Sequence, residues 1–294
     1  MTCLVCGAGQ RLGARIALDL AERGEAVLAT RRTPRPELDR ELLQAGVKLD
    51  RLDLNDLARV QALAGEVDTA VLTPILSVSA PAACMLAEAG VARGVVFSSN
   101  NAGIVTSDPV YDRLRAGEAR VRAAAPGWAI LRPTMIYGHA ADGNLSRLVR
   151  WLRRLPVLPR LGTGRALQQP IHVDDLARLA AALVTGDWPA EGILSVGGPD
   201  RLSHRALLAA VAKAAGAERP ALPVPMGPVS FGVGLAARLG FPLPVTPVQL
   251  ARFELDKLPI EPADPPGCYA PRVGLEEGLA RLVAEVDAQQ GARR

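Results

Sequence analysis

Residues 2–13 read TCLVCGAGQRLG, and this stretch decides how the chain folds. Residues 2–6 form a short, mostly apolar run that predicts a buried β-strand. Gly7, Gly9 and Gly13 follow, and a helical pattern begins at residue 11. Glycines allow a tight turn and a close approach of the backbone to a ligand, and a helix N-terminus offers unpaired N–H groups to a phosphate. The stretch therefore predicts a strand, a phosphate-binding turn and a helix, with an ordinary strand-to-helix turn as the alternative.

The alternation of strand and helix patterns continues through the first half of the chain. Further strands are predicted at 25–30, 47–53, 67–73, 93–99 and 127–131, and helices at 11–23, 36–45, 55–64, 79–90 and 109–124. The strands are continuous apolar runs, as expected where helices cover both faces of a parallel sheet. We therefore predict an α/β fold, a doubly wound parallel sheet of the Rossmann type.

Composition excludes several classes of protein. The 294 residues are 49% hydrophobic and 22% charged, which argues against global disorder. The net charge is only +4 and no stretch forms a basic block, so binding of nucleic acid through charge is not expected. The chain contains no uninterrupted run of about 18 apolar residues, so we expect no membrane span. The opening residues lack the basic region of a signal peptide. We therefore expect a cytoplasmic globular protein.

The cysteine pattern C-x-x-C at Cys3 and Cys6 invites a redox or a zinc interpretation. Both residues fall within the first predicted strand, where positions i and i+3 face opposite sides. No second cysteine pair follows at ligand spacing, and the three histidines are scattered. We expect buried, reduced thiols and no metal site.

Two arginines, Arg31 and Arg32, follow the second predicted strand. An acidic residue at this place in a Rossmann fold binds the ribose hydroxyls of NAD. Guanidinium groups there suit the 2′-phosphate of NADP, which arginine binds bidentately. The pair predicts a preference for NADP over NAD, and a solvated loop is the alternative interpretation.

Three later stretches indicate a family of Rossmann-type proteins. They are VVFSS at 95–99, ILRPTMIYG at 130–138 and GTGRALQQPIHVDDLA at 162–177. With the glycine turn they resemble the NAD(P)-dependent epimerase/dehydratase family, the extended and atypical branch of the short-chain dehydrogenase/reductase superfamily. The resemblance covers nearly the whole chain. It implies a Rossmann domain of residues 1–137 with 165–198, and a smaller substrate-binding domain of residues 138–164 with 199–294.

The resemblance also implies where NADP or NAD would bind. Gly7, Gly9, Gln10, Arg11, Leu12 and Gly13 would follow the pyrophosphate, although Gln10 stands where the family has a glycine. The remaining cofactor positions are Asp53 and Leu54 beside the adenine, Leu72, Thr73 and Pro74 after the fourth strand, Ser98 after the fifth, and Pro133 and Thr134 at the nicotinamide end.

The catalytic positions depart from the family pattern. Family members use a Ser or Thr after the fifth strand and a Tyr-x-x-x-Lys pair, in which the tyrosine exchanges a proton with the substrate. Here Tyr111 is the matching tyrosine and Arg115 occupies the lysine position, while Ser99 and Asn100 follow the fifth strand. A guanidinium can favour phenolate as an ammonium does, and an amide can donate a hydrogen bond but cannot relay a proton. An ordinary helix-entry role for Tyr111 is the alternative.

These observations predict an NAD(P)-dependent oxidoreductase or epimerase-like protein that acts on a carbonyl or hydroxyl of a small molecule, with a sugar nucleotide as one substrate class. The alternative is a dinucleotide-binding sensor or assembly factor with a degenerate active site. In the second half, residues 143–155 and 203–215 predict helices. The apolar, proline-rich segment 220–247 predicts a packed helix, with a lid, the face of a homodimer or a membrane-surface contact as alternatives.

Overall fold

The computed structural model describes residues 1–104, 108–186, 192–238, 255–259 and 270–291. The chain divides into two compact units. Unit 1 contains residues 1–134, 171–197 and 259–272, and unit 2 contains residues 135–170, 198–258 and 273–294. Cys268, Tyr269 and residues 239–247 of the apolar segment lie outside the described residues.

Unit 1 is built on a seven-stranded parallel sheet in the order β11-β6-β5-β4-β1-β2-β3. The strands are β1 (Thr2–Cys6), β2 (Ala26–Arg31), β3 (Lys48–Arg51), β4 (Thr69–Ile75), β5 (Arg93–Phe97), β6 (Trp128–Pro133) and β11 (Gly192–Val196). The order reverses between β1 and β4, and the carboxyl ends beside such a reversal form the usual ligand-binding edge of a doubly wound sheet. The predicted Rossmann-type α/β fold is confirmed.

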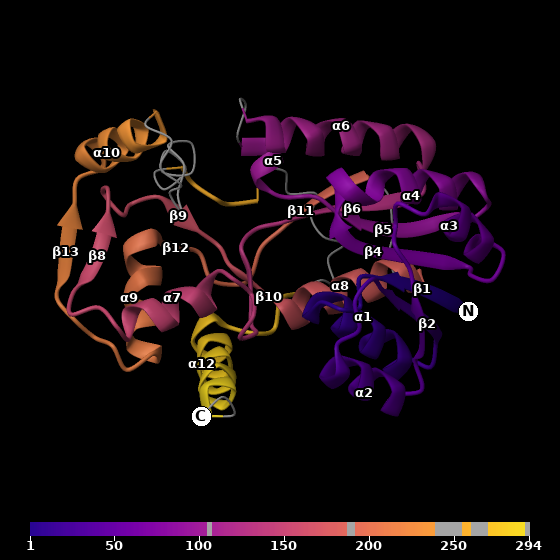
Figure 1. The fold of residues 1–294 in the computed structure, drawn as a ribbon, viewed down its shortest axis with the longest axis horizontal. Coiled ribbons are helices and arrows are strands. Elements are labelled where there is room, and N and C mark those ends of the chain that lie inside the picture. Colours follow the sequence, from indigo (N-terminus) through magenta and orange to yellow (C-terminus); the bar gives the residue numbers. More distant parts are fainter. Residues whose placement is uncertain (105–107, 187–191, 239–254, 260–269, 292–294) are drawn as a thin grey trace. The chain divides into compact units, whose positions relative to one another are not determined.

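Helices cover both faces of this sheet (Figure 1). One face carries α1 (Arg11–Glu22), α2 (Pro36–Gln44) and α8 (Val173–Thr185). The other carries α3 (Leu57–Ala64), α4 (Leu76–Glu88) and α6 (Pro109–Ala124), and the short α5 (Asn101–Ile104) precedes α6. The short strand β10 (Ile171–His172) leads into α8. The side chains between the sheet and α3, α4 and α6 form one continuous apolar core.

The two cysteines of the C-x-x-C pattern lie in this sheet. Cys6 belongs to the core under α3, α4 and α6, and alternation along β1 places Cys3 on the opposite face. Both side chains are buried, and burial raises the pKa of the Cys6 thiol to about 11. Among the described residues, no group of His, Cys, Asp or Glu could hold a metal ion.

Unit 2 consists mainly of helices with short strand pairs. Its helices are α7 (Leu145–Leu152), α9 (His204–Ala214), α10 (Met226–Arg238) and α12 (Leu275–Gly291). Its strands are β7 (Ile136–Tyr137), β8 (Leu158–Leu161), β9 (Leu167–Gln168), β12 (Leu202–Ser203) and β13 (Ala221–Val224). The apolar faces of α7, α9 and α12 pack together, and Tyr137 lies so close to Gly278 of α12 that a Cβ there would stand 2.3 Å from the tyrosine oxygen. None of the helices described here is long and apolar enough to cross a membrane.

Candidate cofactor and active site

The glycine turn after β1 is held against the end of β2. The backbone N–H groups of Gly7 and Ala8 both donate to the Thr30 carbonyl, at 2.9 and 3.0 Å. Gly7 has φ +95°, a conformation that residues with a side chain rarely adopt, and a Cβ there would stand 2.3 Å from Thr73 Oγ1. Gly7 is therefore required both by its backbone conformation and by the close approach of β4.

Gly13 lets α1 approach the turn closely. A Cβ at Gly13 would stand 2.5 Å from the Gly7 carbonyl oxygen and 2.9 Å from the Ala8 nitrogen. Because these are backbone atoms, they cannot move aside without shifting α1 or the turn. The partly buried Leu12 lies between Gly13 and the helix start at Arg11, and Gly13 keeps this start next to the loop.

The N-terminus of α1 has the character of an anion site. Gln10 stands at the N-cap position with an extended backbone, its side chain makes no capping hydrogen bond, and the first turn contains no acidic residue. First-turn N–H groups have no partner within their own helix and lie at the positive end of its dipole. A pyrophosphate fits this donor set, and the resident side chains do not compete for it.

The two arginines after β2 differ in their surroundings. The Arg31 guanidinium binds both carboxylate oxygens of Asp39 on α2, with Nε 2.7 Å from Oδ1 and Nη2 2.8 Å from Oδ2. Its Nη1 donates to the Asp50 carbonyl at 3.2 Å. Arg32 is exposed to solvent. The guanidinium of Arg31 is thus bound by a carboxylate of the same chain, whereas Arg32 is exposed to solvent.

The positions assigned beside the adenine follow β3. Asp53 is exposed and accepts hydrogen bonds from the backbone and side-chain nitrogens of Asn55, at 3.0 and 2.9 Å. The backbone hydrogen bond from Asn55 is the main reason why the pKa of the Asp53 carboxyl lies below its usual value. Leu54 is buried in the core of unit 1. The carboxylate of Asp53 is therefore ionised, and the turn that it forms leads into α3.

The end of β4 lies next to the glycine turn. Leu72 is fully buried, and the Thr73 hydroxyl donates to the Cys6 carbonyl at 2.9 Å. Pro74 also approaches the turn, because its Cδ would lie 3.0 Å from a Cβ at Gly7. The structure thus brings Thr73 and Pro74 to the turn, and their role in lining a cofactor stays a prediction.

A buried charged cluster lies under the ends of β5 and β6. Glu118 of α6 binds Arg132 of β6 through Nε at 2.8 Å and Nη2 at 2.6 Å, and it accepts a hydrogen bond from the Ser98 hydroxyl. The three side chains are between 3% and 8% exposed. This cluster was not predicted, although a glutamate on the inward face of a helix was a signal in the sequence. Ser98 therefore contributes its hydroxyl to the interior of unit 1.

Backbone hydrogen bonds join the residues that follow these strands. The N–H of Asn100 donates to the Pro133 carbonyl at 3.1 Å, and the N–H of Thr134 donates to the Val196 carbonyl at 2.9 Å. Ser99 Oγ accepts from the Asn101 N–H at 3.3 Å. The loops after β5 and β6 therefore share one hydrogen-bonded edge at the carboxyl ends of their strands.

Tyr111 lies at the start of α6 and is buried in the apolar core of unit 1, with 7% of its surface exposed. Its hydroxyl accepts a hydrogen bond from the Asn101 side-chain amide at 3.2 Å. Arg115 donates to the Ala102 carbonyl at 2.7 Å and forms an ion pair with Asp112. Asn101 was not predicted as a site residue, because the Ser or Thr of the family pattern was sought at the preceding positions, Ser99 and Asn100.

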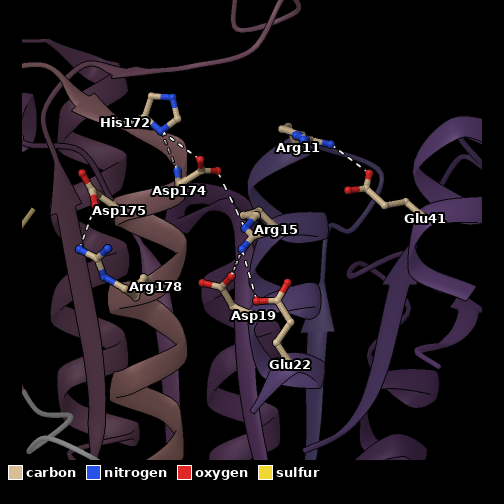
Figure 2. A network of polar contacts seen from close by, with 9 residues as sticks. All are labelled: Arg11, Arg15, Asp19, Glu22, Glu41, His172, Asp174, Asp175 and Arg178. Carbon is tan, nitrogen blue, oxygen red and sulfur yellow. Dashed lines mark hydrogen bonds and ion pairs between the residues drawn. The ribbon is translucent and has the colours of Figure 1, made fainter. Parts of the chain in front are cut away.

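The helix that follows the glycine turn, α1, is tied to α8 by a polar network, shown in Figure 2. Arg15 of α1 lies 2.7 Å from Asp19 and 3.9 Å from Asp174 of α8. Asp174 also lies 3.5 Å from His172, whose Nδ1 accepts a hydrogen bond from the Asp174 N–H and caps α8. Burial raises the pKa of Asp19, and Arg15 opposes this effect. The network fixes the direction of α1 and hence the position of its N-terminus.

Comparisons with known proteins agree on the fold. No protein-family model and no curated protein matches the sequence. The UDP-glucose 4-epimerase of Thermotoga maritima, solved with UDP-glucose, is 15% identical with a TM-score of 0.72, over 99% of this chain and 100% of that one. The UDP-glucuronic acid 4-epimerase of Bacillus cereus with NAD is 16% identical with a TM-score of 0.74, over 99% and 98%. A dTDP-glucose 4,6-dehydratase of Streptomyces venezuelae with NAD is 19% identical with a TM-score of 0.72, again over 99% and 98%.

These similarities extend over almost the whole length of both chains, so the chain shares the fold of these two epimerases and of the dehydratase. The fold implied by the sequence resemblance is thereby confirmed.

Proposed function

We propose that the protein is an NAD(P)-dependent oxidoreductase or epimerase that acts on a hydroxyl or carbonyl of a sugar nucleotide. The observation that carries the proposal is the glycine turn between β1 and the N-terminus of α1, which has no side-chain cap, in a chain whose fold matches epimerases solved with NAD and UDP-sugars. A bound nicotinamide would accept or supply the hydride. Gly7, Gly13 and the first turn of α1 would hold the pyrophosphate.

In this proposal Tyr111 is the proton donor or acceptor. The Asn101 amide donates a hydrogen bond to its oxygen and so helps to hold the hydroxyl in place. Asn101 thus contacts the tyrosine oxygen, whereas Arg115, at the position of the family's lysine, binds the Ala102 carbonyl. Arg115 would help to position Asn101, because it donates a hydrogen bond to the Ala102 carbonyl in the same helical turn.

Turnover by variants tests this assignment. Tyr111→Phe removes the hydroxyl and keeps the ring, and loss of a general acid lowers turnover by about 10²–10⁴-fold. Tyr137→Phe makes the same change in the core of unit 2 and is the matched control. Substrate conversion would be measured with UDP-glucose, UDP-glucuronic acid and dTDP-glucose, beside cofactor affinity for each variant. Robust turnover that Tyr111→Phe does not slow would contradict the catalytic assignment.

The alternative function is a dinucleotide-binding sensor or assembly factor. It is favoured by the small exposure of Tyr111 and by the engagement of Arg115 with Asp112 and Ala102. On this reading the protein binds the dinucleotide tightly and converts none of the three sugar nucleotides. Tyr111→Phe would then leave cofactor binding unchanged, whereas a bulky residue at Gly13 would abolish it.

For the cofactor we propose either nicotinamide dinucleotide, with NADP preferred through the exposed guanidinium of Arg32. Arg31 contributes less than its position in the sequence suggests, because Asp39 holds its side chain. Titration of the parent protein with both cofactors tests the preference, and tighter binding of NAD than of NADP would refute it.

A further inference from the structure

We propose that Asp39 is a specificity-determining residue of the cofactor site, because it holds the Arg31 guanidinium and restrains the affinity for a 2′-phosphate. The inference rests on the proposed function. The inference goes beyond the proposed function because it assigns a role to Asp39 of α2, which is not one of the expected cofactor positions.

Arg31 stands beside the candidate phosphate turn. Thr30, its chain neighbour, accepts the two hydrogen bonds that fix the turn, from Gly7 and Ala8. The Arg31 Cβ lies 3.4 Å from the place that a Cβ at Gly9 would take. The stem of Arg31 therefore packs against the turn, and rotation about its side-chain bonds decides whether the charged end faces a cofactor or α2.

The charged end faces α2. Arg31 Nη2 donates a hydrogen bond to Asp39 Oδ2, Nε lies at ion-pair distance from Oδ1, and Nη1 donates to the Asp50 carbonyl. Both side chains of the ion pair are only 14% exposed, so solvent screens the pair weakly. A 2′-phosphate would have to displace Asp39, and the carboxylate would then lie close to a second anion. Both effects disfavour NADP, whereas NAD carries no group at this position.

A second ion pair on the same helix provides a contrast. Glu41 of α2 lies 3.0 Å from Arg11, the first residue of α1, and Figure 2 shows this pair. Its side chains are 35% and 40% exposed. Arg11 belongs to the turn expected to meet the pyrophosphate, which NAD and NADP share. Release of Arg11 should therefore change the affinity for both cofactors alike, and only release of Arg31 should change their ratio.

The test is calorimetric titration of the 294-residue chain with NAD⁺ and NADP⁺. Asp39→Asn keeps the size of the side chain and removes its charge. It is expected to raise NADP⁺ affinity about tenfold and to leave NAD⁺ affinity within about twofold. Glu41→Gln is the matched control, and it should leave the ratio of the two affinities unchanged.

Arginine variants test the same idea without altering Asp39. In the parent protein Arg31→Ala should change NADP⁺ affinity by no more than about twofold, because the guanidinium is already neutralised. In the Asp39→Asn background, Arg31→Ala should remove the gain in NADP⁺ affinity completely.

Two outcomes separate the inference from the proposed function. Binding of both cofactors with a ratio that Asp39→Asn does not alter would refute the role of Asp39 and leave the proposed function standing. A parent protein that binds neither cofactor would refute the proposed function itself. A large loss of NADP⁺ affinity in Arg31→Ala of the parent would likewise refute the inference, since Arg31 would then already bind the 2′-phosphate.

Discussion

Glu118→Gln is expected to lower the free energy of unfolding of unit 1 by about 3–5 kcal/mol, because it leaves the Arg132 guanidinium charged, buried and without its carboxylate. The exposed fractions of Glu118 and Arg132 are 3% and 8%, so water cannot replace the lost partner. The Ser98 hydroxyl also loses a charged acceptor. Removal of all three groups should lower stability much less: Ser98→Ala, Glu118→Leu and Arg132→Met together remove both charges of this cluster, and such replacements are often nearly neutral.

The assay is urea unfolding followed by tryptophan fluorescence. Trp128 begins β6, four residues before Arg132, and is 2% exposed, so its emission reports unfolding of unit 1. Replacing Trp151 and Trp188 by Phe leaves Trp128 as the only tryptophan of the chain. This isolates unit 1 from unit 2, which need not unfold in the same transition.

The exposed ion pair Arg153–Asp287 in unit 2 provides the control, and because Trp128 reports only on unit 1, urea unfolding of this variant is followed by circular dichroism. Asp287 is 53% exposed, and the hydrogen bond from Arg153 holds the pKa of its carboxyl below the usual value. Asp287→Asn should change stability by less than about 1 kcal/mol, as is typical of solvated pairs. A change below about 1 kcal/mol for Glu118→Gln as well would refute the argument that burial makes this cluster essential.

Three further predictions concern single residues. In the native protein at pH 8, Cys6 should resist alkylation by iodoacetamide, since a thiol whose pKa is about 11 is only about 0.1% thiolate, and mass spectrometry after labelling checks this. Gly13→Ala should destabilise unit 1 by about 1–3 kcal/mol and weaken cofactor binding, because its Cβ would meet the Gly7 carbonyl; Gly65→Ala, with open space around it, is the control in urea titrations. Burial lowers the pKa of His204 below 6.5 in the folded chain, so the stability that its neutral form contributes is lost as the pH falls from 6.5 through this lower pKa. His204→Gln should remove this part of the decline in urea midpoints below pH 6.5.

Much of unit 1 could be predicted from local patterns. The apolar runs at 2–6, 93–99 and 127–131 became β1, β5 and β6, with ends that moved by a few residues. The helix expected at 79–90 begins earlier, at Leu76, because β4 passes directly into α4. The parallel pair β8 and β13 was not predicted, since each strand is short and its partner lies far along the chain.

The candidate site was only partly predictable, because some of its contacts join residues that lie far apart in the sequence. Gly7 and Gly13 are necessary because of local geometry, and the sequence identified both. The partners of the charged side chains depend on which elements pack together, and no local pattern specifies that. Arg31 was interpreted as a cofactor residue, yet its carboxylate partner is supplied by the helix that follows.

By itself, the amino-acid sequence determined the alternation of strands and helices, the glycine turn and the class of fold, because hydrophobic periodicity and backbone freedom act over a few residues. Tertiary structure alone decided that Asn101 meets the Tyr111 hydroxyl, that Glu118 joins Ser98 to Arg132, and that α1 and α8 share one polar network. The physical reason is that a charged or polar side chain chooses its partner by distance and burial in the folded chain, and both quantities arise only when the elements have packed.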